Sequence, residues 1–361
     1  MKSLIELYNQ TKFCTILTTG RTGSDYLQAC LDNVPGVLTF SGHFQYYNFC
    51  DNLKINKFDE KKPIEILELF IKRNNHLFLK DDIENKNIDL DMQKFKNNFI
   101  KISENKNLTR QKFLFCVYLS YHLTLNRDCN SINTMVHHSH STEETKRFLY
   151  DFKNSKLLIT IRDPRANLKS GIVNWINYDK EKDNQRHFYF YIKRIRENLK
   201  FAKKQINEKF FVKLEEANDI DIKKKLTNFL GIDFNPEIMK ATFAGKTWSG
   251  DKLSQSQSKD GSYNKKSINN QWESFFSRKD KLILNLIYSD YRLFGYKIDK
   301  INWTQMTSIF FLIPLPFAFD KKLFSLKYYF SKNISMKKKV VDIFFYIKRI
   351  FYFYKLFFKL G

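Results

Sequence analysis

The chain has 361 residues, of which 43% are hydrophobic and 16% aromatic, so its length fits one large α/β domain with an appendage or two domains. Its formal net charge of +24 points to a polyanionic partner, which is nucleic acid, an anionic membrane or a small polyanionic ligand. Five cysteines without a C-x-x-C pair argue against a secreted disulfide framework, and the first twelve residues are too polar for a signal peptide. We therefore expect a cytoplasmic protein.

The first informative stretch reads as a strand, a short loop and a helix. The apolar run at residues 13–17 predicts a buried strand, and a helical pattern begins at Asp25. The residues between them are rich in glycine and hydroxyl groups and include Arg21. Loop amides, the positive end of a helix and a guanidinium suit an anionic oxygen cluster. Because the lysine of a nucleoside-triphosphatase P-loop is missing, the loop predicts a phosphate site of another kind, or a structural turn that binds nothing.

A second strand and helix follow the same plan. Residues 157–161 have the composition of a parallel strand buried on both faces, and Pro164 then forces a turn into a helix. Arg162 lies at the carboxyl end of this strand, and Ser170 lies two turns into the helix. Open α/β sheets bind ligands at the carboxyl ends of their strands, so both side chains point to one ligand site. The alternative is that Arg162 merely pairs with Asp163.

Strand and helix patterns alternate through the rest of the chain. Further strands are expected at residues 37–40 and 210–214, and helices at 63–73, 141–152, 187–207, 219–230, 272–276 and 277–294. This alternation predicts an α/β fold of three layers, with a central parallel sheet and helices on both faces. Residues 113–119 fit a helix or a strand equally well, and residues 245–270 predict a lid or binding loop.

Two motifs in this order resemble those of the PAPS-dependent sulfotransferases. The segment TTGRTGSDYL is similar to their 5'-phosphosulfate loop, written R-S-G-S/T-T-x-L. The segment IRDPRANLKS resembles their 3'-phosphate motif, an arginine followed eight residues later by a serine. Two later segments resemble further motifs of the family more weakly: VKLEEA and NNQWESFFSRKDKLILNLIYSDYRLFGY. The resemblance covers residues 10–297 and implies the sulfotransferase fold, with its P-loop-like strand-loop-helix, in a bacterial or carbohydrate-type member.

The resemblance implies in-line transfer of a sulfuryl group from 3'-phosphoadenosine-5'-phosphosulfate (PAPS) to an acceptor hydroxyl, without a metal, leaving adenosine 3',5'-bisphosphate. Arg162 and Ser170 would hold the 3'-phosphate, and Arg21 would face the bond that breaks. The 5'-phosphosulfate would be bound by the loop residues Thr19, Gly20, Arg21, Thr22, Gly23, Ser24 and Asp25. The expected acceptor is a carbohydrate hydroxyl, on a lipid-linked or cell-surface glycan.

Asp25 and the histidines raise separate questions. Asp25 stands where the family has threonine or asparagine, and its carboxylate would repel the phosphosulfate unless it turns outward or caps its helix. His43 follows the second strand where some relatives carry a glutamate base, so it is expected to take the acceptor's proton, unless it is an ordinary strand-end residue. His137, His138 and His140 have no acid or cysteine at ligand spacing, so no metal is expected.

Residues 301–361 lie outside the resemblance and carry eleven Lys and Arg against two acids. Residues 309–319 are apolar but too short to span a bilayer. Residues 340–360 place five charges within an arc of about 140° and leave the aromatic side chains mostly elsewhere on the helical wheel. This pattern is typical of an interfacial helix on an anionic membrane. The alternative is a helix packed on the domain with its basic face in water.

The sequence therefore predicts a sulfotransferase domain over residues 1–300 and a basic extension over residues 301–361, on the inner face of a membrane. One alternative is a nucleotide kinase or a similar phosphate-loop enzyme, against which the missing loop lysine argues. The other is a non-enzymatic basic protein that binds membranes or nucleic acid. The two placed motifs and the lack of a nucleic-acid-binding signature argue against it, so no nucleic acid partner is expected.

Overall fold

A computed structural model describes residues 2–40, 42–53, 61–79, 90–104, 108–178, 186–248, 250, 272–318, 321, 324–331 and 334–360. The chain divides into two compact units. The first consists of Met1–Thr18, Thr22–Ile161 and Phe201–Ser267, and the second of Thr19–Arg21, Arg162–Lys200 and Ile268–Gly361. The chain thus enters the second unit at Thr19, directly after the first strand, and returns at Thr22.

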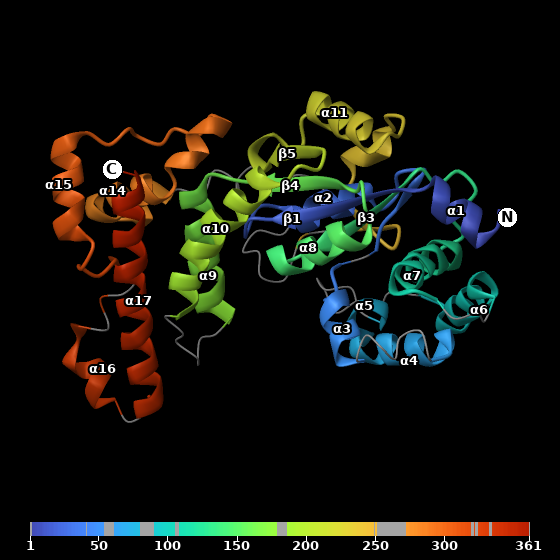
Figure 1. Ribbon diagram of the computed structural model, residues 1–361, viewed down its shortest axis with the longest axis horizontal. Coiled ribbons are helices and arrows are strands. Elements are labelled where there is room, and N and C mark those ends of the chain that lie inside the picture. Colours follow the sequence, from blue (N-terminus) through green and yellow to red (C-terminus); the bar gives the residue numbers. More distant parts are fainter. Residues whose placement is uncertain are drawn as a thin grey trace. The chain divides into compact units, whose positions relative to one another are not determined.

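The first unit is built on a five-stranded sheet in the order β2-β3-β1-β4-β5, and every neighbouring pair is parallel (Figure 1). The strands are β1 (Lys12–Thr18), β2 (Val37–Leu38), β3 (Thr134–Ser139), β4 (Lys156–Ile161) and β5 (Lys209–Lys213). A hairpin of β6 (Thr242–Phe243) and β7 (Lys246–Thr247) lies outside this sheet. The predicted α/β class with a central parallel sheet is confirmed.

Alternate residues of the central strand enter two different cores, as the pleat of a strand requires. Cys14 and Ile16 of β1 pack with the helices α2 (Ser24–Leu31) and α11 (Ile220–Leu230). Phe13 packs instead with α8 (Thr142–Asp151), which runs along the sheet in Figure 1. The sheet therefore carries helices on both faces, and this explains why β1 and β4 are mostly apolar without alternation.

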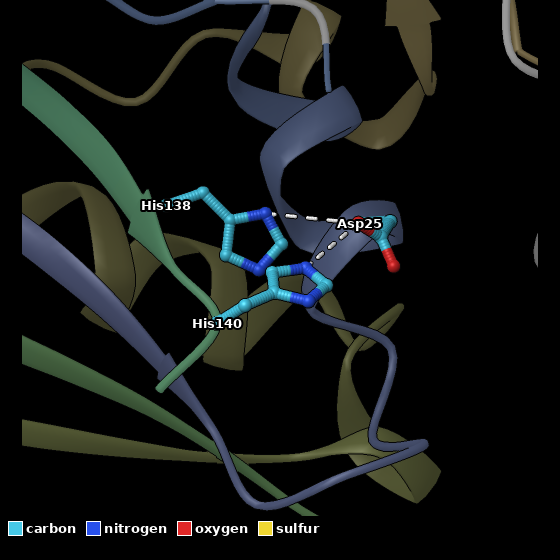
Figure 2. A group of neighbouring side chains, drawn as sticks. All are labelled: Asp25, His138 and His140. Atoms are coloured by element: carbon cyan, nitrogen blue, oxygen red, sulfur yellow. Dashed lines mark ion pairs between the residues drawn. The ribbon is translucent and has the colours of Figure 1, made fainter. Parts of the chain in front are cut away.

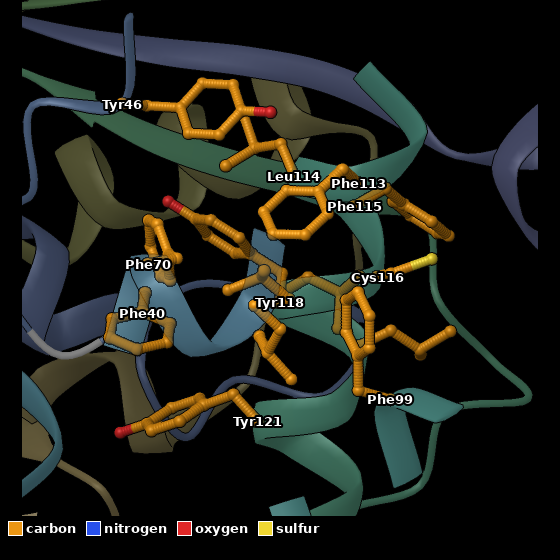
Figure 3. Packing of buried hydrophobic residues seen from close by; sticks show 14 of the residues in the cluster. Phe40, Tyr46, Phe70, Phe99, Phe113, Leu114, Phe115, Cys116, Tyr118 and Tyr121 are labelled. Carbon is orange, nitrogen blue, oxygen red and sulfur yellow. The ribbon is translucent and has the colours of Figure 1, made fainter. Parts of the chain in front are cut away.

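A helical layer extends the second of these cores. Its helices are α1 (Leu4–Gln10), α3 (Tyr46–Asn52), α4 (Pro63–Arg73), α5 (Asn75–Leu79), α6 (Met92–Ser103) and α7 (Arg110–Thr124). Every residue of α7 from Phe113 to His122 is buried, and Figure 3 shows Phe113, Tyr118 and Tyr121 within this aromatic cluster. A helix buried on all sides has no polar face, so its sequence shows no helical periodicity. This is why residues 113–119 fitted either element; they are helical.

The second unit is helical. Its helices are α9 (Pro164–Tyr178), most of α10 (Arg186–Lys204), α13 (Trp272–Phe275), α14 (Arg278–Ile287), α15 (Trp303–Leu312), α16 (Leu326–Phe330) and α17 (Met336–Leu360). Arg165 connects three segments of this unit. It pairs with Asp163 and donates to the Lys297 carbonyl, and its guanidinium carbon lies 3.9 Å from the centroid of the Trp272 ring. Within the described residues, no helix is long and apolar enough to cross a membrane.

Most predicted elements lie where the sequence indicates, with three differences. The second strand is shorter than predicted and ends at Leu38. The helix predicted at 277–294 is α14 followed by the 3-10 helix η4 (Ser289–Phe294), which is capped by Gly295 with φ of 79°. The strand β3 was missed altogether, although it is an inner strand that pairs with both β1 and β2. Most of the predicted 245–270 loop, and Ser41, lie outside the described residues.

Candidate functional site

The part of the predicted phosphate loop that belongs to the second unit is held by two polar side chains. The Arg21 amide donates to the Asn167 Oδ1 and to the Tyr191 hydroxyl, both at 2.8 Å. The Asn167 Nδ2 donates to the Thr19 carbonyl at 3.1 Å. Gly20 has φ of 129°, and a Cβ there would lie 2.7 Å from both Asn167 and Tyr191. Only glycine therefore fits between these anchors.

Tyr191 lies among three arginines. Burial raises the pKa of its phenol, while the positive charges of Arg21, Arg194 and Arg162 lower it, so all three guanidinium groups lie close enough to act on it. Burial also lowers the pKa of Arg194. The Tyr191 ring packs on α9 at Gly171, where a Cβ would come within 2.1 Å of the ring. The second unit thus concentrates positive charge beside the loop residues Thr19–Arg21, as an anion site requires.

The two residues predicted for a 3'-phosphate both lie in this unit. Arg162 directly follows β4 and is only 4% exposed, and Ser170 is half-buried on α9. Ser170 lies three residues after Asn167, so the two share one face of the helix. The neighbouring Asp163 pairs with Arg165 at 2.7 Å.

The remaining loop residues belong to the first unit and lead into α2. Gly23 has φ of 76° and precedes the first helical residue, Ser24, so the amides at this end of α2 have no side-chain cap. The Thr22 hydroxyl lies 3.0 Å from the Thr18 hydroxyl and 2.7 Å from that of Thr160, at the ends of β1 and β4. It therefore joins the two strand ends, and only its backbone amide is left to face an anion.

Asp25 lies beside His138 of β3 and His140, which directly follows β3 (Figure 2). Its Oδ1 lies 3.6 Å from the His138 Nδ1 and 3.8 Å from the His140 Nε2. Burial acts to raise the pKa of Asp25, but contact with His140 and the fields of the partly exposed His140 and His43 outweigh it and lower the pKa. The carboxylate is thus ionised and lies beside His138 and His140.

The tautomer of His138 follows from its neighbours. Gln28 uses its amide nitrogen to donate to the carbonyls of Phe40 and Gly42, so its Oε1 accepts from the His138 Nδ1 at 2.9 Å. The proton of neutral His138 therefore sits on Nδ1. Burial lowers the pKa of His138 well below its usual range, so this ring stays neutral.

His43 also belongs to this cluster of histidines, and the sequence did not predict this position. Its ring stacks on the His140 ring with centroids 3.3 Å apart and an angle of 10° between the planes. Both side chains are partly exposed, whereas His138 is buried. The predicted base and its neighbour His140 are therefore the accessible imidazoles of the group, and Asp25 lies against the second of them.

Asp25, His138 and His140 could also hold a metal ion, since one ligand atom from each lies within 4.8 Å of the others. Three such ligands with an open fourth position are typical of a catalytic zinc site. The sequence did not indicate Asp25 as a ligand, because this residue is far from the histidines along the chain. Because the Nδ1 of His138 donates to Gln28, the lone pair of this ring lies on Nε2, which is buried without a hydrogen-bond partner among the described residues.

Four residues were not singled out from the sequence: Gln28 in the first unit, and Asn167, Tyr191 and Arg194 in the second. Asn167 lies inside the IRDPRANLKS motif, and its position on the Ser170 face of a helix was the signal that could have found it. The roles of Tyr191 and Gln28 depend on hydrogen bonds between segments far apart in the chain. Nothing in the local sequence indicates such bonds.

Comparison with known proteins gives similarity at the level of structure only. No protein-family model matches the chain, and no curated protein sequence matches it. Among solved structures, the chain is similar to the sulfotransferase domain from the Synechococcus PCC 7002 olefin synthase, with a TM-score of 0.45 and 14% identity over 80% of this chain and 96% of that one.

Two further solved structures are similar to the chain. The sulfotransferase domain from the curacin biosynthetic pathway has a TM-score of 0.45 and 14% identity, covering 80% of this chain and 99% of that domain. The sulfotransferase STF9 from Mycobacterium avium has a TM-score of 0.39 and 12% identity, covering 82% of this chain and 80% of its own.

Proposed function

We propose that the protein is a sulfotransferase that moves a sulfuryl group from PAPS to an acceptor hydroxyl. The observation that supports this most is the anchoring of the Arg21 amide by Asn167 and Tyr191, with the charges of Arg162 and Arg194 close by. A glycine loop fixed in this way beside three guanidinium groups suits a nucleotide with separated anionic groups better than a single phosphate.

The donor would be bound by residues in two roles. Arg162 and Ser170 bind the 3'-phosphate, and Arg194 adds charge on the same side. Thr19, Gly20, Arg21 and the amides of Thr22, Gly23 and Ser24 bind the 5'-phosphosulfate, because helix N-termini and glycine loops favour anions. Asp25 takes no direct part in this binding; its carboxylate lies against His138 and His140.

Transfer would proceed in line. An imidazole takes the acceptor's hydroxyl proton as the acceptor oxygen bonds to sulfur, while the bond from sulfur to the bridging oxygen breaks and adenosine 3',5'-bisphosphate leaves. Arg21 stabilises the negative charge that develops on the bridging oxygen. His43 is the proposed base, and the stacked His140 lies against Asp25, so a carboxylate is near the charge that forms on the imidazole. This chemistry needs no metal.

For the acceptor we propose a carbohydrate hydroxyl, on a lipid-linked or cell-surface glycan, reached by a cytoplasmic enzyme on a membrane surface. The exposed apolar and basic side chains of residues 301–360 support the membrane position. Transfer of label from radioactive PAPS to a panel of glycans and glycolipids would identify the acceptor.

The donor is tested by thermal unfolding with adenosine 3',5'-bisphosphate, ATP or Mg-ATP. We expect only the bisphosphate to raise the melting temperature, because a ligand at one hundred times its Kd stabilises a protein by about 2.7 kcal/mol. Arg162→Ala should abolish the shift, and Arg278→Ala, an exposed arginine of the same unit, should leave it intact. An equal shift with Mg-ATP would favour a kinase, and no shift with any nucleotide would favour a non-enzymatic basic protein.

A further inference from the structure

The last helix, α17, exposes apolar side chains. A stripe of six of them is between 39% and 72% exposed: Val340, Ile343, Phe344, Ile347, Phe351 and Phe358. At about 100° per residue the stripe spans an arc of roughly 100°. We call these six residues the apolar stripe. A continuous exposed strip of large apolar side chains is uncommon on a monomeric protein in water and marks an interaction surface.

The side of α17 that packs on the protein is partly polar. Lys339, Asp342 and Arg349 are only 6%, 1% and 2% exposed. Lys339 donates to the carbonyls of Tyr329 and Ser331 at 2.7 and 3.1 Å, and Asp342 accepts from the Tyr328 hydroxyl.

Arg349 also makes contacts within the same segment. It donates to the Leu315 carbonyl at 3.1 Å and lies 4.5 Å over the Tyr346 ring and 5.0 Å over the Phe317 ring. The sequence predicted one basic arc that included Asp342 and Arg349, and this is wrong, because both are buried. A helix with charges inside and phenylalanines outside has the reverse of the polarity expected for a helix in water.

Lysines border the stripe. Lys337, Lys348, Lys355 and Lys359 are all exposed, and on the helical wheel they lie next to one edge of it. The Lys348 Nζ lies 4.3 Å over the Phe344 ring, so the charge of this lysine lies directly against the stripe. Apolar side chains flanked by lysines are the arrangement of a helix that lies in the interface of an anionic bilayer.

The stripe continues onto α15. The Phe310 ring lies 5.3 Å from the Tyr354 ring and 6.4 Å from the Phe358 ring, and Phe311 beside it is 69% exposed. The apolar surface is therefore wider than one helix. This width favours a flat, extended partner such as a membrane over a single peptide.

We propose that the apolar stripe enters the interfacial layer of an anionic membrane, with the four lysines at the level of the lipid phosphates. Charge favours lipid over a second copy of the chain as the occupant. Residues 301–361 carry eleven Lys and Arg and two acids, so two such segments repel each other and anionic lipid attracts them. The proposal does not depend on sulfuryl transfer.

The experiment uses the full chain with vesicles of phosphatidylcholine alone or mixed with phosphatidylglycerol. All five native cysteines are buried, so Phe351→Cys can be labelled selectively with an environment-sensitive fluorophore. Ile206→Cys, at a fully exposed position outside the segment, is the control. We expect the label at 351, and not at 206, to shift to shorter wavelength with the mixed vesicles. An unchanged spectrum at 351 would overturn the proposal.

Co-sedimentation with the same vesicles tests each part of the surface. Ile347→Asn with Phe351→Asn should lower the partition coefficient at least about 100-fold, since two buried side chains are lost. Ile206→Asn should leave it unchanged. Lys348→Gln and Lys355→Gln should each lower it about fivefold, and less at high salt.

Circular dichroism establishes that each variant is folded. Equal sedimentation of the stripe variant and the wild type would contradict insertion. A dimer in sedimentation velocity that Ile347→Asn with Phe351→Asn dissociates, and that vesicles leave intact, would assign the stripe to a second copy of the chain.

Discussion

The proposed base, His43, is one of two stacked histidines, and the other is His140. If His43 takes the acceptor's proton, His43→Ala should lower turnover by about 100-fold or more, because general base catalysis contributes this much. Binding of adenosine 3',5'-bisphosphate should be unchanged, since the loop and the arginines do not involve His43. Turnover is measured with labelled PAPS and binding by calorimetry.

Two further variants make this test specific. Gln45→Ala, at an exposed position two residues away, should have full activity. Unchanged turnover in His43→Ala together with a large loss in His140→Ala would assign the base to His140.

The same residues carry a prediction about metals. Asp25, His138 and His140 have ligand atoms within 4.8 Å of one another. Because the proposed in-line transfer needs no metal, we expect EDTA to leave turnover unchanged. A loss of activity on chelation that zinc restores, and that His140→Ala makes irreversible, would show a metal centre in place of a hydrogen-bonded cluster.

At the scale of elements, α7 and β2 are joined by a buried histidine. The Nε2 of His122 lies 2.8 Å from the oxygen and 3.1 Å from the nitrogen of Thr39, which directly follows β2. Burial, with a smaller effect from Arg127, lowers the pKa of His122 from 6.5 to about 3. The folded protein therefore keeps this ring neutral over a range in which the unfolded chain takes up a proton.

The sign of the pH effect follows from this difference. Below pH 6.5 the unfolded state binds the proton and the folded state does not, so the free energy of unfolding falls as the pH falls toward 3. The loss is at most about 1.4 kcal/mol per pH unit. His122→Gln can keep both contacts and cannot titrate, so its urea midpoint should fall less steeply between pH 7 and 4. Parallel curves for the two proteins would contradict this.

For the molecule as a whole, the sequence predicted best where a single segment carries the information. The apolar strands β1 and β4, each followed by a glycine or proline turn, were recognised because composition alone marks them. The strand β3 was missed because its sequence, TMVHHS, is half polar. It can be buried only because Tyr118 bonds to His137 and Gln28 to His138, and these partners lie far away in the chain.

The candidate site divides in the same way. Arg21, Arg162 and Ser170 were found through motifs. The roles of Tyr191 and Arg194 follow only from their neighbours in the folded chain. Asp25 was singled out as a conflict, and the contact that explains it comes from β3, which local sequence did not predict. Residues whose roles arise from long-range contacts stay invisible to periodicity and spacing.

The polar bonds of Lys339, Asp342 and Arg349 also bear on how the last helix meets its partner. Basic tails that are disordered in solution lose conformational entropy when they become helical on a surface, and this cost weakens their binding. Here the buried polar contacts hold α17 against its neighbours before any partner arrives. The helix is therefore preorganised, and its backbone loses little further conformational entropy when it binds to a surface.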